Sequence, residues 1–355
     1  MKNSLTKIVV INFLVLLISI LFIEIFFGNW FSEHNFGPYM REHRLKKNPV
    51  VLTYKDIQYK YIYKRNYHGF RGEEMDPSEI EAVIIGGSTI DERYKPYELS
   101  ITGNLNSLLK KNDYNFEITN AGIEGQSTAG HIYNFEHWFP KLKNFSPKLY
   151  IFYIGLNDYN SNYENENYNT KGNDGHVRNP EAIEVFFDSF KSSSFIYDKL
   201  RKIKQKYYTT AKIMKYDHNF FGLQDSKNYE YINYEKALKL HDLKELKLKY
   251  QGLISGYLHR VKILNNHVKK RNAVPIFINQ VNFEGVRNER LFIINHSLIE
   301  YCMDKNLYCI DLADKFNGKF NYWYDDVHTT GEGSKLIAET LINDLIEIVR
   351  QGKIY

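Results

Sequence analysis

The stretch EAVIIGGSTIDE, residues 81–92, decides how the rest of the chain is interpreted. A short apolar run ends in two glycines, which predicts a buried strand followed by a sharp turn. Ser88, directly after the glycines, could be a nucleophile at the strand end, the edge of a phosphate-binding loop, or an ordinary turn residue. The phosphate-binding alternative is disfavoured, because no lysine follows Ser88 or Thr89 and the glycine spacings of nucleotide-binding loops are absent.

From residue 80 onward, apolar runs that predict strands alternate with amphipathic stretches that predict helices. The strands are expected at 81–87, 115–122, 148–155, 273–280 and 307–313. The helices are expected near 99–111, 128–143, 237–270, 288–305 and 330–350, the last with Thr329 and Glu332 at capping-box spacing. This alternation favours a mostly parallel sheet covered on both faces. Ligands of such sheets bind beyond the carboxyl ends of the strands, so the loops there are the place to look for a site.

Composition narrows the possible functions. The 355 residues, 43% of them hydrophobic and 25% charged, predict a globular protein with an ample core. The net charge of +5 is small and the basic residues form no stripe, so no nucleic-acid partner is expected. No cluster of histidines and carboxylates has the spacing of metal ligands, so neither a metal nor another cofactor is expected. Cys302 and Cys309 fit no zinc or redox motif and are expected to be small core-lining side chains.

The N-terminus carries a candidate membrane anchor. Residues 8–27, IVVINFLVLLISILFIEIFF, contain three polar residues and would span roughly 30 Å as a helix, the thickness of one hydrocarbon core. Lys2 and Lys7 precede this run, so its start is expected in the cytoplasm and the remainder of the chain outside. The bulky residues that follow lack a small-x-small cleavage site, which favours a retained anchor over a cleaved signal peptide.

These patterns predict three segments: a membrane anchor at 1–30, a polar juxtamembrane arm at 31–78, and a globular domain at 79–355. Residues 159–236 interrupt the alternation of strands and helices with an asparagine-rich stretch and a basic, partly helical one. Insertions of this length in compact domains are usually lids, binding loops or flexible segments. A solvated excursion without a function is an equally good interpretation.

Four expected strand-end loops hold residues that together could perform acyl transfer: 86–89, 120–127, 155–158 and 325–333. A serine hydroxyl needs an adjacent base, usually a histidine that a carboxylate orients. Asp325 precedes His328 by three residues, a spacing that lets the carboxylate reach the imidazole in a turn entering a helix. Asp326 is a weaker candidate for the same role. The sequence therefore predicts Ser88 as nucleophile, His328 as base and Asp325 as its orienting acid.

Acyl transfer also requires hydrogen-bond donors for the negative charge that develops on the carbonyl oxygen. The candidates are the Ser88 backbone N–H, the Gly125 backbone N–H and the Asn157 side-chain amide. Glycine permits close approach of the backbone, and an amide donates without titrating. Taken alone, Gly125 could be a left-handed turn residue and Asn157 part of an Asx turn.

The four loops in this order resemble the sequence blocks of the SGNH hydrolases, the GDSL-type esterase and lipase family. Ser88 falls in the first block, Gly125 in the second, Asn157 in the third, and Asp325 with His328 in the last. The resemblance covers about residues 80–350 and implies a three-layer α/β/α sandwich around a five-stranded parallel sheet, the flavodoxin-like SGNH hydrolase fold. It also implies the Ser-His-Asp triad and an oxyanion hole made by Ser88, Gly125 and Asn157.

One position departs from the family. Gly87 stands where the first block usually has an aspartate, which removes a carboxylate that would help to order the loop. Gly-Gly-Ser-Thr resembles a variant found among membrane-anchored bacterial members, and the upstream GFRGEE, residues 69–74, resembles their usual lead-in.

The anchor and the resemblance together predict a single-pass serine esterase whose catalytic domain lies outside the cytoplasmic membrane. The expected substrates are O-acyl esters, most concretely O-acetyl esters, of cell-envelope carbohydrate. Two alternatives stay open. The same acyl-enzyme could pass its acyl group to a surface polysaccharide as an O-acyltransferase, or the fold could serve as a catalytically silent carbohydrate-binding module.

Overall fold

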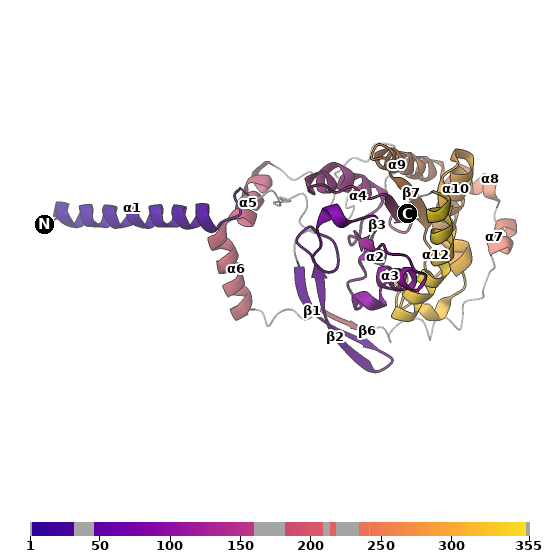
Figure 1. Ribbon diagram of the computed structural model, residues 1–355, viewed down its shortest axis with the longest axis horizontal. Helices are drawn as coiled ribbons and strands as arrows, with labels where there is room; N and C mark the ends of the chain where they lie inside the picture. Colours follow the sequence, from indigo (N-terminus) through magenta and orange to yellow (C-terminus); the bar gives the residue numbers. More distant parts are fainter. Residues whose placement is uncertain are drawn as a thin grey trace. The chain divides into compact units, whose positions relative to one another are not determined.

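The computed structural model describes residues 2–31, 46–159, 182–208, 214–217, 234–240 and 242–352 (Figure 1). The chain divides into two compact units, one of Met1–Arg41 with Pro180–Lys212 and the other of Glu42–Asn179 with Ile213–Tyr355. The asparagine-rich stretch at 159–179 was predicted as a loop. All of it after residue 159 lies outside the described residues.

The larger unit is built on a five-stranded parallel sheet. Its strands lie in the order β4-β3-β5-β7-β8, and every neighbouring pair is parallel. The bounds are β3 (Ala82–Gly86), β4 (Ile118–Asn120), β5 (Leu149–Ile154), β7 (Val274–Asn279) and β8 (Tyr308–Ile310). The predicted sheet is confirmed, although β4 and β8 are shorter than their apolar runs. The strand order reverses beside β3, the position in such sheets where loops diverge and leave room for a ligand.

Helices cover both faces of this sheet (Figure 1). On one face, Ile84, Ile151 and Ile276 pack in a common core with α3 (Ile101–Lys111), α11 (Leu312–Phe316) and α12 (Gly331–Gln351). On the other, Phe152 stacks on Phe277 and contacts Phe135, under α4 (Thr128–Tyr133), α9 (Gln251–Lys269) and α10 (Glu289–Lys305). Continuous burial of β5 on both faces explains why its sequence shows no alternation. The predicted three-layer α/β/α sandwich is confirmed.

Short turns of helix complete the larger unit. They are η2 (Pro77–Glu79), α2 (Ser88–Asp91), η3 (Tyr97–Leu99), η4 (Asn134–Trp138), η5 (Phe139–Lys141), α7 (Tyr234–Leu240), α8 (Leu243–Lys249), η7 (Gly285–Arg287) and η8 (Phe320–Tyr322). The prediction of a single helix at 237–270 is therefore wrong. Asp242 caps a new helix, α8, because its side chain accepts hydrogen bonds from the backbone N–H groups of Lys244 and Glu245. The helix predicted at 128–143 likewise loosens into η4 and η5, where Pro140 lies in the first turn.

The last helix begins one residue later than its predicted cap. Thr330 is the N-cap of α12, and its hydroxyl accepts a hydrogen bond from Gly333 N at 3.2 Å. The predicted cap, Thr329, instead shares a hydrogen bond with the Ser334 hydroxyl at 3.0 Å. Thr329 thereby fixes the segment that carries His328 against the start of α12.

The segment predicted as a juxtamembrane arm contains a β-hairpin. Strands β1 (Lys46–Tyr54) and β2 (Ile57–Arg65) pair antiparallel, and β6 (Met214–Asp217) adds to β1 in parallel. The two-residue turn places Lys55 and Asp56 at φ values of 48° and 62°, the backbone of a tight hairpin turn. The hairpin delivers the buried side chain of Arg65 to α2, which places it in contact with the segment that carries Ser88.

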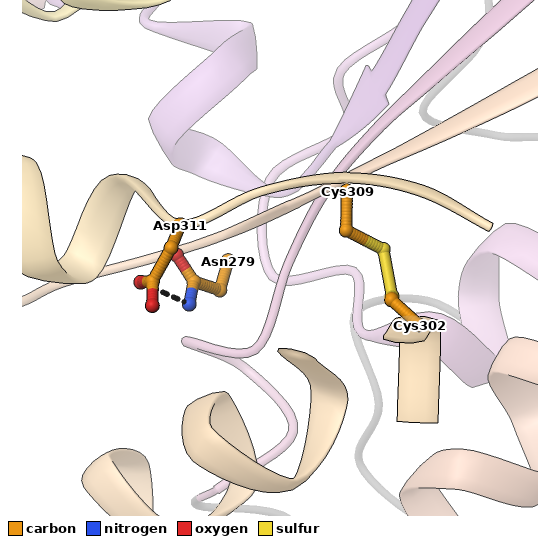
Figure 2. Close-up of a disulfide and its surroundings, with 4 residues drawn as sticks. All are labelled: Asn279, Cys302, Cys309 and Asp311. Carbon is orange, nitrogen blue, oxygen red and sulfur yellow. Dashed lines mark hydrogen bonds between the residues drawn. A yellow bond between two sulfur atoms is a disulfide. The ribbon is translucent and has the colours of Figure 1, made fainter. Parts of the chain in front are cut away.

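The two cysteines form a disulfide (Figure 2). Cys302 lies near the end of α10 and Cys309 in β8, and their Cα atoms are 6.2 Å apart, within the range that a disulfide requires. Cys302 is buried in the core as predicted, but Cys309 is only partly buried, and the disulfide between them was not predicted. Asn306 ends α10 in the left-handed conformation, so the chain turns straight back into β8 and brings the two positions together. Beside the bridge, the Asn279 amide donates to Asp311 Oδ1 at 2.8 Å (Figure 2).

The smaller unit consists of α1 (Lys2–Phe27), α5 (Ala182–Ser193) and α6 (Phe195–Tyr208). Within α1, Thr6–Phe27 is long and apolar enough to cross a membrane, with a mean hydropathy of 2.9. Its apolar side chains are exposed along its length. Part of the predicted insertion therefore associates with the N-terminal helix.

Candidate active site

Ser88 lies at the carboxyl end of β3. The strand ends at Gly86, and α2 begins at Ser88 with Gly87 as its N-cap. The backbone N–H groups of Ile90 and Asp91 both donate to the Gly87 carbonyl, at 3.1 and 3.0 Å. The turn is therefore fixed by its own backbone, and it leaves the Ser88 side chain partly exposed above the sheet.

The structure brings His328, which lies 240 positions further along the chain, into contact with Ser88, and Asp325 contacts His328. His328 Nε2 lies 2.8 Å from Ser88 Oγ, and His328 Nδ1 lies 2.7 Å from Asp325 Oδ2. Asp325 Oδ1 accepts the backbone N–H groups of Val327 and His328, at 2.9 and 2.6 Å. Asp326, the weaker candidate, is exposed. The three residues thus have the contacts that a nucleophile, its base and an orienting acid require.

The protonation of Asp325 follows from these contacts. Burial alone would raise the pKa of Asp325, but the hydrogen bonds from the His328 side chain and from two backbone N–H groups outweigh it and hold the pKa below its ordinary value. An ionised Asp325 accepts a hydrogen bond from the Nδ1–H group of His328, which leaves Nε2 as the acceptor facing the Ser88 hydroxyl. This is the tautomer that general-base catalysis needs.

Two tyrosines enclose the imidazole. The Tyr324 ring stacks on His328 with centroids 5.8 Å apart, and the Tyr94 ring meets it edge-on at 4.7 Å. The Tyr94 hydroxyl reaches the Ser88 carbonyl at 3.3 Å. Tyr94 therefore contacts both the residue predicted to attack and the residue predicted to activate it.

The loops after β3, β4 and β5 meet beside Gly87. The Asn157 amide donates to the Gln126 carbonyl at 2.8 Å. A Cβ atom on Gly87 would lie 2.2 Å from Asn157 Nδ2 and 3.0 Å from that same carbonyl. Gly125 precedes Gln126 and has a φ of 75°, a conformation that favours glycine. All three predicted oxyanion positions thus come from loops that converge at the end of β3.

The close approach of Asn157 supplies a physical reason for Gly87. Its φ of −83° is negative and by itself does not require glycine there. Space does, because any side chain would have to displace the Asn157 amide or the Gln126 carbonyl. The sequence shows glycine where the resembled family usually has aspartate, but it does not contain this reason.

A buried polar network joins the second and third loops. Asp158 accepts hydrogen bonds from the backbone N–H and the hydroxyl of Thr128. Arg260, on α9, donates to the Thr128 hydroxyl at 2.7 Å and to Asp158 at 3.3 Å. All three side chains are at most 1% exposed, so the network holds the Asn157 loop in a low-dielectric environment.

Gln280 links the third loop to α2. It directly follows β7, and its amide nitrogen donates to Thr89 Oγ1 at 2.8 Å. Its amide oxygen accepts the backbone N–H of Leu156 at 2.8 Å. A residue next to Ser88 and a residue next to Asn157 are thereby held by one side chain.

A buried ion pair joins α2 to the segment that carries His328. Lys95 donates to Glu92 Oε1 at 2.8 Å, to the Thr329 carbonyl at 2.5 Å and to the Ser334 hydroxyl at 2.5 Å. The Glu92 carboxylate also accepts the Ser334 hydroxyl at 2.6 Å and the Ile101 N–H at 2.6 Å. Both charged side chains are fully buried. The pair connects the segment after Ser88 to the residue that follows His328.

One arginine from β2 and one from the lead-in at 69–74 also contact α2 and the residues that follow it. Arg65 and the Tyr63 hydroxyl bind Asp91 Oδ1, at 2.9 and 2.6 Å. Arg71, in the GFRGEE stretch, donates to the carbonyls of Asp91 and Lys95 at 2.7 and 2.8 Å. The lead-in therefore stabilises the turn that presents Ser88.

Burial of His131 predicts a dependence of stability on pH. His131, on α4, is 1% exposed, and burial lowers its pKa from 6.5 to about 4. As the pH falls from 6.5 to 4, the unfolded chain binds a proton that the folded chain excludes, so stability is lost over that window. The expected loss is about 3 kcal/mol of unfolding free energy. Urea unfolding at pH 7 and pH 4.5 measures it, and His131→Leu should remove most of the difference. An unchanged pH dependence in that variant would contradict the assignment to His131.

Across the residues that the structure describes, no group of three or more His, Cys, Asp or Glu side chains is placed to hold a metal ion. The convergence at Ser88 instead offers a hydroxyl, an imidazole and nearby amide donors. That donor set suits acyl chemistry rather than metal ligation.

Comparison with known proteins gives structural neighbours but no sequence relatives. No family model matches the sequence, and no curated protein matches it. Among solved structures, the chain is similar to lipolytic proteins of the G-D-S-L family. One, from Desulfitobacterium hafniense, is 14% identical with a TM-score of 0.40, and the match covers 74% of this chain and 98% of that one.

Two further solved structures are similar to this chain. The acetylxylan esterase Axe2 of Geobacillus stearothermophilus, in a catalytic mutant, is 12% identical with a TM-score of 0.42, over 75% of this chain and 96% of that one. TesA is 9% identical with a TM-score of 0.39, over 76% and 99%. At these values the likeness carries no argument about substrate or activity, which have to come from the site itself.

Proposed function

We propose that this protein is a membrane-anchored serine esterase of the SGNH hydrolase type. The observation that carries the proposal is the continuous chain of short contacts from Ser88 Oγ through His328 to Asp325, at 2.8 and 2.7 Å. Three side chains from two distant segments meet in the order that nucleophilic catalysis needs. The order of the four motifs along the sequence supports the same family.

In the proposed mechanism, Ser88 Oγ attacks the ester carbonyl carbon while its proton passes to His328 Nε2. Asp325 stays ionised and stabilises the imidazolium that results. The tetrahedral intermediate then collapses, and the alcohol leaves with the proton from His328. Water then attacks the acyl-enzyme and gives its proton to His328, which returns a proton to Ser88 Oγ as the acyl group leaves; in the transferase alternative a sugar hydroxyl takes the place of water.

The oxyanion would receive hydrogen bonds from the backbone N–H groups of Ser88 and Gly125 and from the Asn157 amide. The Asn157 NH₂ group has two hydrogens and uses one for the Gln126 carbonyl. Its second hydrogen suits a substrate oxygen bound over Gly87. Each such donor typically contributes about 3–4 kcal/mol to the transition state.

The proposed location is the outer face of the cytoplasmic membrane, with α1 as a retained single span. The lysines before the span support this orientation. The Cys302–Cys309 disulfide supports it independently, because disulfides persist in oxidising compartments outside the cytoplasm. A domain held there meets cell-envelope carbohydrate, so O-acyl esters of that polymer, O-acetyl esters above all, are the proposed substrate class.

Turnover of p-nitrophenyl acetate by the full chain in detergent tests this proposal. Ser88→Ala is expected to lower kcat/KM by roughly 10³-fold or more, because the nucleophile is lost while the fold is kept. Ser78→Ala, at an exposed serine, should leave the rate unchanged. Equal activity in wild type and Ser88→Ala would refute the serine mechanism.

The same assay separates the alternatives. Supplying an oligosaccharide acceptor tests for acyl transfer: faster release of p-nitrophenol together with acetate on the sugar would identify an O-acyltransferase. Binding of the oligosaccharide without any turnover would identify a carbohydrate-binding module with a silent triad.

A further inference from the structure

The end of the N-terminal helix holds a carboxylate that its apolar surroundings do not explain. Glu24 lies within the candidate span Thr6–Phe27. Its side chain accepts the Ser194 hydroxyl at 2.7 Å and the backbone N–H groups of Phe195 and Ile196, at 3.0 and 3.1 Å. Glu24 therefore caps the N-terminus of α6, where a negative charge meets unpaired N–H groups and the positive end of the helix dipole.

Further contacts join the same two segments. The Trp30 indole N–H donates to Glu24 Oε2 at 3.1 Å, and the Asn29 N–H donates to the Ser193 carbonyl at 2.8 Å. Ring centroids lie 5.5 Å apart both between Phe27 and Phe195 and between Trp30 and Phe190. The carboxyl end of α1 thus meets α5 and α6 at their junction (Figure 1). These contacts lie within a single compact unit.

The two joined helices expose apolar side chains. On α5 these are spaced as one helical face, Ile183, Phe186, Phe187 and Phe190, each at least 46% exposed. On α6 the corresponding exposed residues are Tyr197, Leu200 and Ile203, each at least 37% exposed. Exposed apolar patches of this kind mark surfaces that contact a membrane or another protein.

The charge and position of the helices indicate what covers them. The sequence of α6 contains five lysines and arginines and one acidic residue, the charge expected of a helix at an anionic lipid surface. The helices also contact the carboxyl end of an apolar helix whose side chains are exposed along most of the candidate span. A carboxylate is tolerated at the end of such a helix only near the membrane surface, and Glu24 sets α6 at that depth.

We propose that α5 and α6 form an interfacial helix pair that lies in the headgroup region of the membrane spanned by α1. Their exposed apolar residues enter the acyl boundary, and the basic residues of α6 bind acidic phospholipid headgroups. Glu24 fixes the pair to the end of the anchor. This inference rests on the proposed retention of α1 as a span. It assigns a lipid partner to part of the insertion at 159–236, for which sequence alone left a lid and a solvated excursion open.

Spin labels on the full chain in phosphatidylglycerol vesicles test the proposal. Single cysteines introduced as Phe187→Cys, Leu200→Cys and Lys199→Cys can be labelled because the native pair is joined in a disulfide. Oxygen should collide with the labels at 187 and 200 more often than a water-soluble nickel chelate does, and the order should reverse at 199. Phosphatidylcholine vesicles should weaken this contrast at 200, because they lack the anionic headgroup.

A Leu16→Cys label, in the middle of the span, tests the membrane anchor separately from the interfacial helix pair. Oxygen-rich collisions at 16 with water-like collisions at 187 and 200 would overturn the interfacial pair and leave the anchor standing. Water-like collisions at 16 would overturn both. Dipolar broadening between labels at 187 would assign the apolar face to a second copy of the chain and also overturn the lipid partner.

A variant at the cap provides an independent measurement. Glu24→Gln retains the shape but removes the charge, and Glu24→Leu removes the cap altogether. Loss of the depth contrast between labels at 199 and 200 is expected for Glu24→Leu, with a smaller loss for Glu24→Gln. Unchanged contrast in Glu24→Leu would refute the fixing role of Glu24. Turnover of a water-soluble ester should be the same in all of these proteins.

Discussion

Gly87→Ala is expected to lower kcat by roughly 10²–10³-fold, the cost of losing one oxyanion-hole donor. The added methyl group would lie 2.2 Å from Asn157 Nδ2, so the amide has to leave the position from which it would donate to the oxyanion. KM for a small ester should change little, because the lost interaction strengthens only as charge develops. Steady-state kinetics with p-nitrophenyl acetate gives both values.

A double-mutant cycle makes this prediction specific. In an Asn157→Ala background the atom that the methyl group would strike is absent, so adding Gly87→Ala should cost far less than it does in the wild type. Gly331→Ala is the matched control, since a methyl group there meets Leu99 at an ordinary contact distance of 3.4 Å. Losses that simply add for Gly87→Ala and Asn157→Ala would contradict the proposed contact.

Lys95→Met should destabilise the folded state by about 3–5 kcal/mol, because it leaves the Glu92 carboxylate buried without a cation. Burial lowers the pKa of Lys95, but the adjacent Glu92 carboxylate favours its charged form. The variant also removes the hydrogen bond to the Thr329 carbonyl, one residue from His328, so kcat should fall as well. Urea unfolding and ester kinetics measure the two effects.

The charge-free pair supplies the test of mechanism. Glu92→Gln combined with Lys95→Met removes both buried charges and should recover much of the stability lost in Lys95→Met alone. The exposed pair Lys55–Glu332 is the control, with side chains 61% and 54% exposed, and Lys55→Met should change stability little. A double variant no more stable than Lys95→Met would show that the charge on Glu92 is not the cause.

The sequence predicted the parts of the fold that local patterns encode. Continuous apolar runs identified the strands of the parallel sheet, because burial on both faces leaves no alternation to misinterpret. The spacing of Asp325 and His328 was sufficient to predict their contact, since both lie in one turn. The convergence of the loops that carry Ser88, Gly125 and Asn157 could be predicted because carboxyl ends of parallel strands meet at one edge of a sheet. Asp325 and His328 precede α12 and do not directly follow a strand, so their contact with Ser88 was predicted from the chemistry of the set and the family resemblance.

Other features depend on contacts that no local pattern encodes. Glu92 and Lys95 resemble an exposed pair in the sequence, and their burial beside Ser334, at the start of α12, depends on a contact between distant segments. Gln280 is the last residue of a predicted strand, a signal that could have marked it, but its two partners are far away in sequence. Prediction of the disulfide would have required knowing that α10 ends at Asn306, where the chain reverses into β8. The contact of Glu24 with the start of α6 joins residues 170 positions apart, which no local pattern predicts.

Mass analysis of the covalent adduct tests the serine mechanism most directly. Full-length protein treated with a fluorophosphonate should gain one phosphonyl group, and peptide mapping should place it on Ser88. Ser88→Ala should gain none, and His328→Ala should react far more slowly, because the base that activates the hydroxyl is missing. A wild-type protein that turns over p-nitrophenyl acetate while Ser88 stays unmodified, or an adduct on another residue, would contradict the account.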